Sequence, residues 1–134
     1  QKLWNLDEVA NSSIVATTAR KTPYDPCPAG WRVPTAAEWQ TIGADDSSTG
    51  KTWSSSTHLL TISAANSLQL LLPAAGCRSS DDGSSGNQGS YGGYWSSSVP
   101  SGSTGARYVT FYSATFNQYT DNRALGFSIR CLQE

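Results

Sequence analysis

The sequence predicts an α+β domain of short antiparallel strands, little helix and long loops. Ala106–Tyr112 alternates apolar and polar side chains with the two-residue period of a strand. Thr35, directly after Pro34, begins the pattern of a short helix. A chain of 134 residues is long enough for one core and too short for two. We therefore expect a single domain over residues 1–134.

The N-terminal part predicts one edge strand and one short helix. Lys2–Leu6 alternates apolar and polar residues, which favours an edge strand. Residues 24–31 contain two prolines and a glycine, which excludes regular structure there. Thr35 and Glu38 have the spacing of a capping box, and the helix that they begin should end near Gly43. Its apolar face is formed by Ala36, Trp39 and Ile42.

The second half of the chain predicts strands around one long loop. Leu68–Leu72 predicts a buried strand that Pro73 stops. In Arg78–Gly105, seventeen of 28 residues are Ser or Gly, which is typical of a flexible linker. Tyr91, Tyr94 and Trp95 interrupt this stretch, however, and aromatic side chains tie a loop to a core. We therefore expect an ordered long loop rather than a linker.

Gly126–Leu132 predicts a last strand, in which Phe127, Ile129 and Cys131 point inward. The strand patterns and the helix face together predict one core. Its expected members are Trp31, Val33, Trp39, Ile42, Leu70, Leu72, Trp95, Val109, Phe111, Phe116, Phe127 and Ile129.

Composition limits the classes of function. The formal net charge is −1 and the nine basic residues are scattered, so we expect no nucleic-acid partner. No run approaches eighteen apolar residues, so we expect no direct membrane insertion by this domain. The low charge, with abundant Ser, Thr and Gly, suits an extracellular binding domain. A chain that starts at Gln1 and lacks Met suggests the C-terminal part of a longer surface protein.

The three cysteines, Cys27, Cys77 and Cys131, are spaced too widely for a zinc knuckle. Two interpretations stay open at this point. The chain contains either one disulfide and one leftover thiol or three reduced, buried thiols.

Motifs for catalysis are missing. His58 is the one histidine, so neither a metal triad nor a Ser-His pair with a second histidine can form. No glycine-rich phosphate cradle occurs, and we expect no cofactor and no enzymatic activity. The acidic pair in Asp81–Gly83 could contact calcium, but a plain solvated turn is the favoured interpretation. Asp45 and Asp46 are interpreted in the same way.

Four segments resemble the Fibrobacter succinogenes major paralogous domain family, which occurs in surface proteins of gut and rumen bacteria. The segments follow one another in the order expected for that family and span most of the chain after about residue 22. They are "YDPCPAGWRVPTAAEW" (Tyr24–Trp39), "LPAAGCR" (Leu72–Arg78), "GNQGSYGGYWSSS" (Gly86–Ser98) and "NRALGFSIRC" (Asn122–Cys131).

The resemblance implies a C-type-lectin-like fold, in the branch of the formylglycine-generating enzymes, with two short helices and a loop-rich second half that presents the ligand surface. That fold pairs its terminal regions, which implies a disulfide between Cys27 and Cys131 and leaves Cys77 as the free thiol. Cys77 stands where the family usually has an aromatic residue. Neither the active-site cysteines and metal ligands of the formylglycine-generating enzymes nor the calcium-lectin signatures are matched, so the resemblance implies neither activity.

The resemblance also extends to the variable proteins of diversity-generating retroelements, in which mutagenesis of adenines rewrites Asn codons near the C-terminus. Family members often carry Asn-rich stretches where this chain carries Tyr, Thr, Arg and Asp. The residues expected to bind ligand are Arg107, Tyr108, Thr110, Tyr112, Thr115, Asn117, Tyr119, Thr120 and Asp121.

The residue types support this expectation independently. Tyr offers a large, rigid contact area, and Ser, Thr and Asn add adaptable hydrogen bonds, as in an antibody paratope. Tyr108, Thr110 and Tyr112 alternate with apolar residues and should point away from the core, while Phe116 anchors a following loop from beneath. In the alternative interpretation, the tyrosines only cover the sheet and pack laterally.

We therefore expect a non-catalytic binding module at the bacterial cell surface, extracellular or on a phage particle. Its expected partner is an unknown protein or cell-surface ligand. Two other functions compete with this one. The first is a structural or adhesin module of a pilus or surface protein with a fixed partner, and the second is a degenerate enzyme of the formylglycine-generating type.

Overall fold

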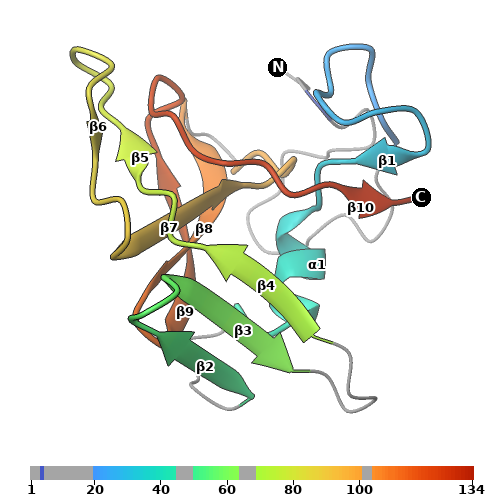
Figure 1. Ribbon diagram of the computed structural model, residues 1–134. Coiled ribbons are helices and arrows are strands. Elements are labelled where there is room, and N and C mark those ends of the chain that lie inside the picture. The colour runs from blue at the N-terminus through green and yellow to red at the C-terminus, as the bar shows by residue number, and fades with distance from the viewer. Residues whose placement is uncertain (1–3, 5–19, 45–49, 64–68, 101–103) are drawn as a thin grey trace.

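The computed structural model describes residue 4 and residues 20–44, 50–63, 69–100 and 104–134. These residues form ten short strands in four antiparallel sheets and one helix (Figure 1). The expected strand Lys2–Leu6, apart from Trp4, and the pair Asp45-Asp46 lie outside the described residues.

Two of the sheets have three strands each and two have two strands each. The first three-stranded sheet contains β2 (Lys51–Ser54), β3 (Leu59–Ser63) and β4 (Gln69–Pro73), and the second contains β7 (Tyr91–Trp95), β8 (Ala106–Tyr112) and β9 (Thr115–Asp121). The two-stranded sheets pair β1 (Trp31–Arg32) with β10 (Leu132–Gln133) and β5 (Cys77–Arg78) with β6 (Ser85–Gly86).

The helix α1 (Ala36–Thr41) begins with the capping box that the sequence predicts. The Thr35 hydroxyl accepts a hydrogen bond from the Glu38 backbone N–H at 3.2 Å, and the Glu38 carboxylate accepts one from the Thr35 N–H at 2.8 Å. Arg32 donates to both Glu38 carboxylate oxygens, at 2.7 and 2.5 Å. Burial opposes ionisation of Glu38, but these hydrogen bonds outweigh it and lower the pKa of the carboxyl. The helix ends at Ile42, beside the predicted Gly43.

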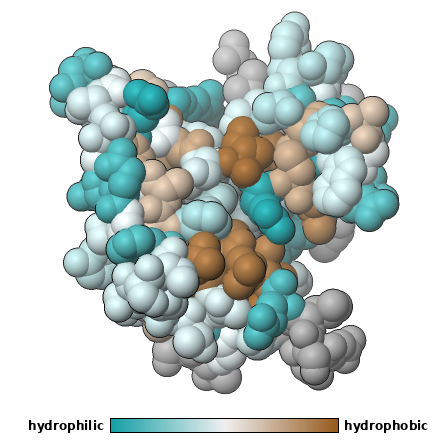
Figure 2. All heavy atoms as spheres, in the orientation of Figure 1, coloured by the Kyte–Doolittle hydropathy of each residue, from teal (hydrophilic) through white to brown (hydrophobic). Residues whose placement is uncertain are grey.

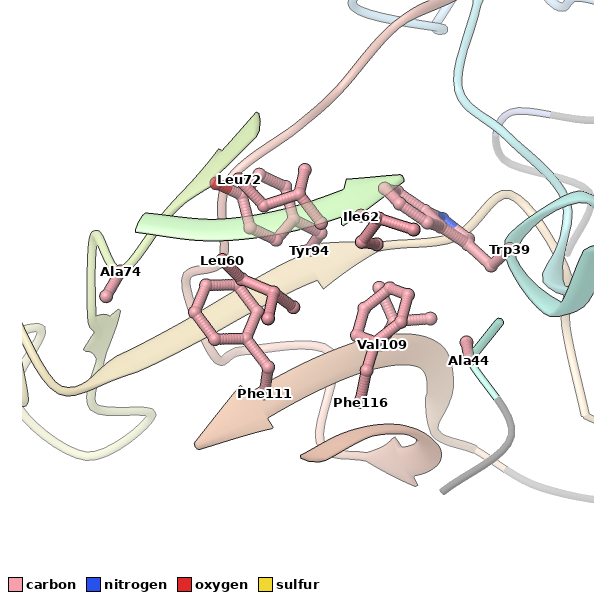
Figure 3. Close-up of a cluster of buried hydrophobic side chains, with 10 residues drawn as sticks. All are labelled: Trp39, Ala44, Leu60, Ile62, Leu72, Ala74, Tyr94, Val109, Phe111 and Phe116. Carbon is pink, nitrogen blue, oxygen red and sulfur yellow. The ribbon is translucent and has the colours of Figure 1, made fainter. Parts of the chain in front are cut away.

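The core lies between the two three-stranded sheets, and α1 closes one end (Figure 3). Trp39 meets the ring of Phe116 edge-on at 6.0 Å, and Phe111 stacks on Tyr94 at 6.4 Å. Trp53 of the facing sheet lies 6.0 Å from Phe111. The buried members of this cluster are Trp39, Ala44, Leu60, Ile62, Leu72, Ala74, Tyr94, Val109, Phe111 and Phe116.

Most of the expected core is confirmed. Seven of its residues are buried, namely Val33, Trp39, Leu72, Trp95, Val109, Phe111 and Phe116. Ile42, Leu70 and Phe127 are half-buried.

The prediction is wrong for Trp31 and Ile129, which are 41% and 37% exposed. The segment from Gly126 to Cys131 makes isolated bridges rather than a strand, so strand alternation does not turn Ile129 inward. Trp31 lies in a sheet with two residues per strand, which is too short to form a covered face. Figure 2 shows apolar side chains at the surface over β4 and over the C-terminal segment.

Several other expectations need correction. The α+β, C-type-lectin-like domain with two helices is wrong, because the described residues are mainly small antiparallel sheets with one six-residue helix. The expected loop Arg78–Gly105 is ordered through residue 100, yet it contains β6 and β7. Residues 115–121 form strand β9 rather than a loop around Phe116. The strand Ala106–Tyr112 is confirmed with its predicted bounds, as β8.

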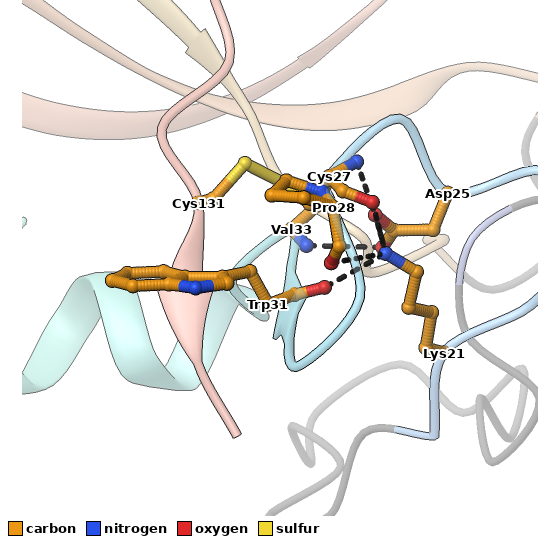
Figure 4. Close-up of a disulfide and its surroundings, with 7 residues drawn as sticks. All are labelled: Lys21, Asp25, Cys27, Pro28, Trp31, Val33 and Cys131. Atoms are coloured by element: carbon orange, nitrogen blue, oxygen red, sulfur yellow. Dashed lines mark hydrogen bonds and ion pairs between the residues drawn. A yellow bond between two sulfur atoms is a disulfide. The ribbon is translucent and has the colours of Figure 1, made fainter.

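The disulfide between Cys27 and Cys131 is confirmed, with Cα atoms 5.8 Å apart, and Cys77 is the free cysteine (Figure 4). Hydrogen bonds fix the loop around Cys27. The Asp25 carboxylate accepts from the backbone N–H groups of Cys27 and Val33, at 2.8 and 3.0 Å. Lys21 donates to the carbonyls of Cys27, Pro28 and Trp31. The C-terminal segment is therefore held against a rigid loop near β1.

Candidate ligand-binding surface

Strands β8 and β9 form a hairpin with Ser113 and Ala114 in its turn. Ser113 has a φ of 59°, in the left-handed region that two-residue hairpin turns require at their first position. The Thr115 hydroxyl donates a 2.7 Å hydrogen bond to the Tyr112 carbonyl across the turn. The turn therefore fixes the register of the two strands, and with it the face on which each side chain lies.

The register divides the hairpin into an inner and an outer face. The inner face carries the pairs Phe111–Phe116, Val109–Gln118 and Arg107–Thr120. The outer face carries the pairs Tyr112–Thr115, Thr110–Asn117, Tyr108–Tyr119 and Ala106–Asp121.

Arg107 and Thr120 therefore do not belong with the other expected ligand-binding residues. They lie opposite each other at positions that alternate with the outer face, on the side of Val109 and Phe111. On the same inner face, the Gln118 side chain donates a 2.8 Å hydrogen bond to the Ala36 carbonyl of α1.

Tyr108 lies on the outer face, but the prediction that it is exposed is wrong. Its exposed fraction is 8% because Phe127 stacks on its ring at 4.5 Å and Trp95 meets it edge-on at 6.0 Å. Burial, together with the neighbouring Tyr91, raises the pKa of Tyr108 well above its ordinary value. This tyrosine is part of a second aromatic cluster and is closed to a ligand.

Phe127 can lie this close because β7 has a glycine beneath it. A Cβ atom at Gly93 would lie 2.4 Å from the Phe127 ring. Tyr91 of the same strand is half-buried, pairs with Tyr112 in the register and lies 6.4 Å from Phe127. Sequence reasoning missed Tyr91 as an outer-face residue because it placed this stretch in a loop. The alternation in Tyr91–Trp95 was the available signal.

Six of the nine expected residues remain on the open part of the outer face. Tyr112 is 65% and Tyr119 is 51% exposed, and the Asn117 amide lies 3.4 Å from the Tyr119 hydroxyl. Thr115 and Asp121 are exposed, and Thr110 and Asn117 are half-buried. We call this set the hairpin surface, and its members are Thr110, Tyr112, Thr115, Asn117, Tyr119 and Asp121.

The other polar motifs have structural partners. His58 Nδ1 lies 2.8 Å from the Gly89 carbonyl. The Asp82 carboxylate accepts hydrogen bonds from the Ser84 hydroxyl and N–H, at 2.7 and 3.0 Å, and these bonds lower the pKa of Asp82. Within the described ranges, no three His, Cys, Asp or Glu side chains are grouped to hold a metal ion. No helix in this part of the chain is long and apolar enough to cross a bilayer.

Comparison with known proteins identifies the family. Neither the curated proteins nor the solved structures gave a match. The family model described as Fibrobacter succinogenes major domain matches residues 1–133, which is nearly the whole chain. The chain belongs to the Fibrobacter succinogenes major domain family.

Proposed function

We propose that this domain is a non-catalytic ligand-binding module and that the hairpin surface makes the contact. The observation that carries the proposal is the exposure of Tyr112 and Tyr119 on one face of a single hairpin, with polar Thr115 and Asn117 between them. Exposed tyrosines with small polar neighbours are typical of surfaces that bind proteins and sugars through many adaptable contacts.

The hairpin supports this role because its two faces are independent. On the inner face Val109, Phe111 and Phe116 are fully buried, so they fix the backbone. The outer side chains of the hairpin surface contribute little to that packing. A scaffold of this kind accepts different outer residues without losing its fold, since exposed substitutions usually change stability by less than about 0.5 kcal/mol.

This separation is what a diversified binding protein needs, and we extend the proposal to a variable protein of a diversity-generating retroelement. The coding DNA tests this extension. A near-identical repeat nearby, with differences confined to template adenines, and a neighbouring reverse transcriptase gene are expected. Their absence would contradict the extension and leave the binding role standing.

The disulfide supports a location outside the reducing cytoplasm. A bond between Cys27 and Cys131 persists in oxidising compartments and is rare in the cytosol. We place the domain in the extracellular space, at the bacterial surface or on a phage particle, where it would meet a protein or cell-surface ligand.

A second candidate function is a structural or adhesin module with one fixed partner. Tyr108 favours it, because this residue of the expected variable set is locked between Phe127 and Trp95. Free variation at Tyr108 would break that packing, whereas an adhesin with a fixed partner has no need to vary it.

The binding role is tested by screening the domain against arrays of glycans and bacterial surface proteins. The double variant Tyr112→Ser/Tyr119→Ser should lose binding to the captured ligands, because a central tyrosine is often worth about 2 kcal/mol or more at an interface. Tyr24→Ser is the matched control, since Tyr24 is 73% exposed and lies outside the hairpin. Ligands that bind both variants as well as the parent protein would contradict the proposal.

A further inference from the structure

We propose a second binding site, separate from the hairpin surface: the pocket beside Ser97 binds a ring-sized organic acid that carries a hydroxyl group. The pocket has a volume of about 130 Å³ and lies at the Trp95–Ala106 end of the β7–β8 pair. Its walls are formed by Trp4, Trp95, Ser96, Ser97, Ser98, Val99, Ala106 and Arg123.

The floor of the pocket is a run of three buried serines, each at most 4% exposed. Ser96 and Ser98 have structural duties. The Ser96 hydroxyl accepts from the Ser98 N–H at 3.0 Å, and the Ser98 hydroxyl accepts from the Ala36 N–H at 3.0 Å, at the start of α1. The Ser97 N–H donates to the Pro34 carbonyl at 2.8 Å, which fixes the backbone between them.

The Ser97 hydroxyl differs from its neighbours. It is buried, lines the pocket and makes no hydrogen bond within the described part of the chain. A buried hydroxyl without a partner costs about 1–3 kcal/mol, so such groups are rare and call for an explanation. Alanine at this position would keep every hydrogen bond of the floor. A ligand that hydrogen-bonds to the hydroxyl accounts for the serine.

Arg123 supplies positive charge at the same pocket. Its Nε donates to the Gly105 carbonyl at 2.9 Å, which orients the guanidinium. Among the described residues the guanidinium makes no other hydrogen bond or ion pair. The terminal N–H groups of an oriented guanidinium match the two oxygens of a carboxylate. The pocket therefore favours an acidic ligand over a neutral one.

The size and the walls limit the rest of the ligand. A volume of 130 Å³ is close to the cavity of about 150 Å³ that binds benzene in another protein, so one ring fills it. Trp4, Trp95 and Val99 offer flat and aliphatic surfaces to that ring. A flat phenolic acid and an acidic sugar share this chemistry, since the apolar face of a pyranose also packs on indole.

The test titrates the ¹⁵N-labelled domain with 4-hydroxybenzoate, benzoate and glucuronate, and follows the assigned Trp95 indole and Ser97 amide signals. Saturable shifts with 4-hydroxybenzoate or glucuronate are expected, and the better of the two identifies the ligand as aromatic or as a sugar acid. The amide signal of Tyr119 on the hairpin surface should not move.

Variants separate the two polar contacts. Ser97→Ala should lower the affinity for the hydroxylated probe about fivefold or more, the worth of one hydrogen bond, and leave benzoate binding unchanged. The melting temperature of this variant should equal or exceed that of the parent. Arg123→Gln should weaken all carboxylate probes, and Arg123→Lys should restore part of the loss.

Tyr112→Ser is the matched control and should bind all three probes like the parent protein. This separates the pocket from the proposed function of the hairpin surface. The proposal is overturned if neither hydroxylated probe gives a saturable shift at Trp95. It is also overturned if the affinity for the hydroxylated probe survives Ser97→Ala, or if Arg123→Gln binds the probes as tightly as the parent.

Discussion

The outer face of the β7–β8–β9 sheet has two halves that differ in a single respect. Both halves present a tyrosine of β8, Tyr108 in one and Tyr112 in the other, at positions of the same parity. Phe127 of the C-terminal segment covers the first, whereas Tyr112 is 65% exposed. Strand alternation therefore decides the direction of a side chain, and a segment far along the chain decides whether that side chain is covered.

The two glycines of β7 permit this difference. A Cβ at Gly92 would lie 2.2 Å from the Phe111 ring on the inner face, and one at Gly93 would lie 2.4 Å from Phe127 on the outer face. Adjacent glycines in a strand thus mark close approach from both sides. The covered half exists because the sheet gives up a side chain there.

The largest effect should follow removal of the tether that holds the C-terminal segment. In Cys27→Ser/Cys131→Ser the unfolded chain regains the entropy of a loop that spans 104 positions, which is worth about 4–5 kcal/mol in the chain-entropy model. Urea unfolding measures the loss, and quenching of Trp95 fluorescence by iodide should increase. Cys77→Ser is the control and should retain most of the stability. An equal loss in that control would contradict the argument.

The next effect should come from the covering ring itself. Phe127→Ala removes the contacts with Tyr108, Trp95 and Tyr91, and we expect a loss of about 3 kcal/mol. Tyr112→Ala in the open half is the matched control and should cost far less. Equal losses in the two variants would show that the halves do not differ.

Gly93→Ala sharpens the same comparison. The added methyl group collides with Phe127, and overpacking of this kind costs about 1–3 kcal/mol. In the double variant Gly93→Ala/Phe127→Ala the collision is gone, so the combined loss should be smaller than the sum of the single losses. Additive losses would place the strain elsewhere.

Alkaline pH should weaken buried tyrosines and spare exposed ones. Burial raises the pKa of Tyr94 to about 12, and its hydroxyl donates a 2.8 Å hydrogen bond to the Pro73 carbonyl. The unfolded tyrosine ionises near about pH 10. A raised folded pKa means that this contribution to stability is complete below about pH 10 and decreases as the pH rises toward about 12.

Urea midpoints over this pH range, in a Cys77→Ser background that prevents thiol exchange, check the prediction. Tyr94→Phe should flatten the alkaline decline. Tyr112→Phe is the exposed control and should keep it. A decline of the same slope in Tyr94→Phe would refute the assignment to this residue.

The smallest effect on stability should come from the open half. Tyr112→Ser and Tyr119→Ser should each shift the free energy of unfolding by about 0.5 kcal/mol or less, because both side chains are more than half exposed. Tyr108→Ser, from the covered half, should cost several times more. Thermal melts compare the three variants, and a Tyr112→Ser loss as large as that of Tyr108→Ser would remove the distinction.

The sequence alone determined the elements that depend on neighbours in the chain. The capping box of Thr35 and Glu38 fixes the start of α1 through contacts three residues apart. The alternation in Ala106–Tyr112 gave strand β8 with its bounds, since side-chain direction in a strand has a period of two. The disulfide partners came from the family resemblance and not from the spacing of the cysteines.

Only the tertiary structure decided which surfaces are covered. Tyr108 has the pattern of an exposed residue and is buried, because Phe127, nineteen positions later (127 against 108), folds back onto Gly93. Ile129 has the pattern of a core residue and is exposed, because its segment makes bridges to other strands instead of a regular strand. The pocket at Ser97 likewise joins segments that no local pattern relates. Local periodicity gives direction within an element, whereas burial depends on contacts between distant parts of the chain.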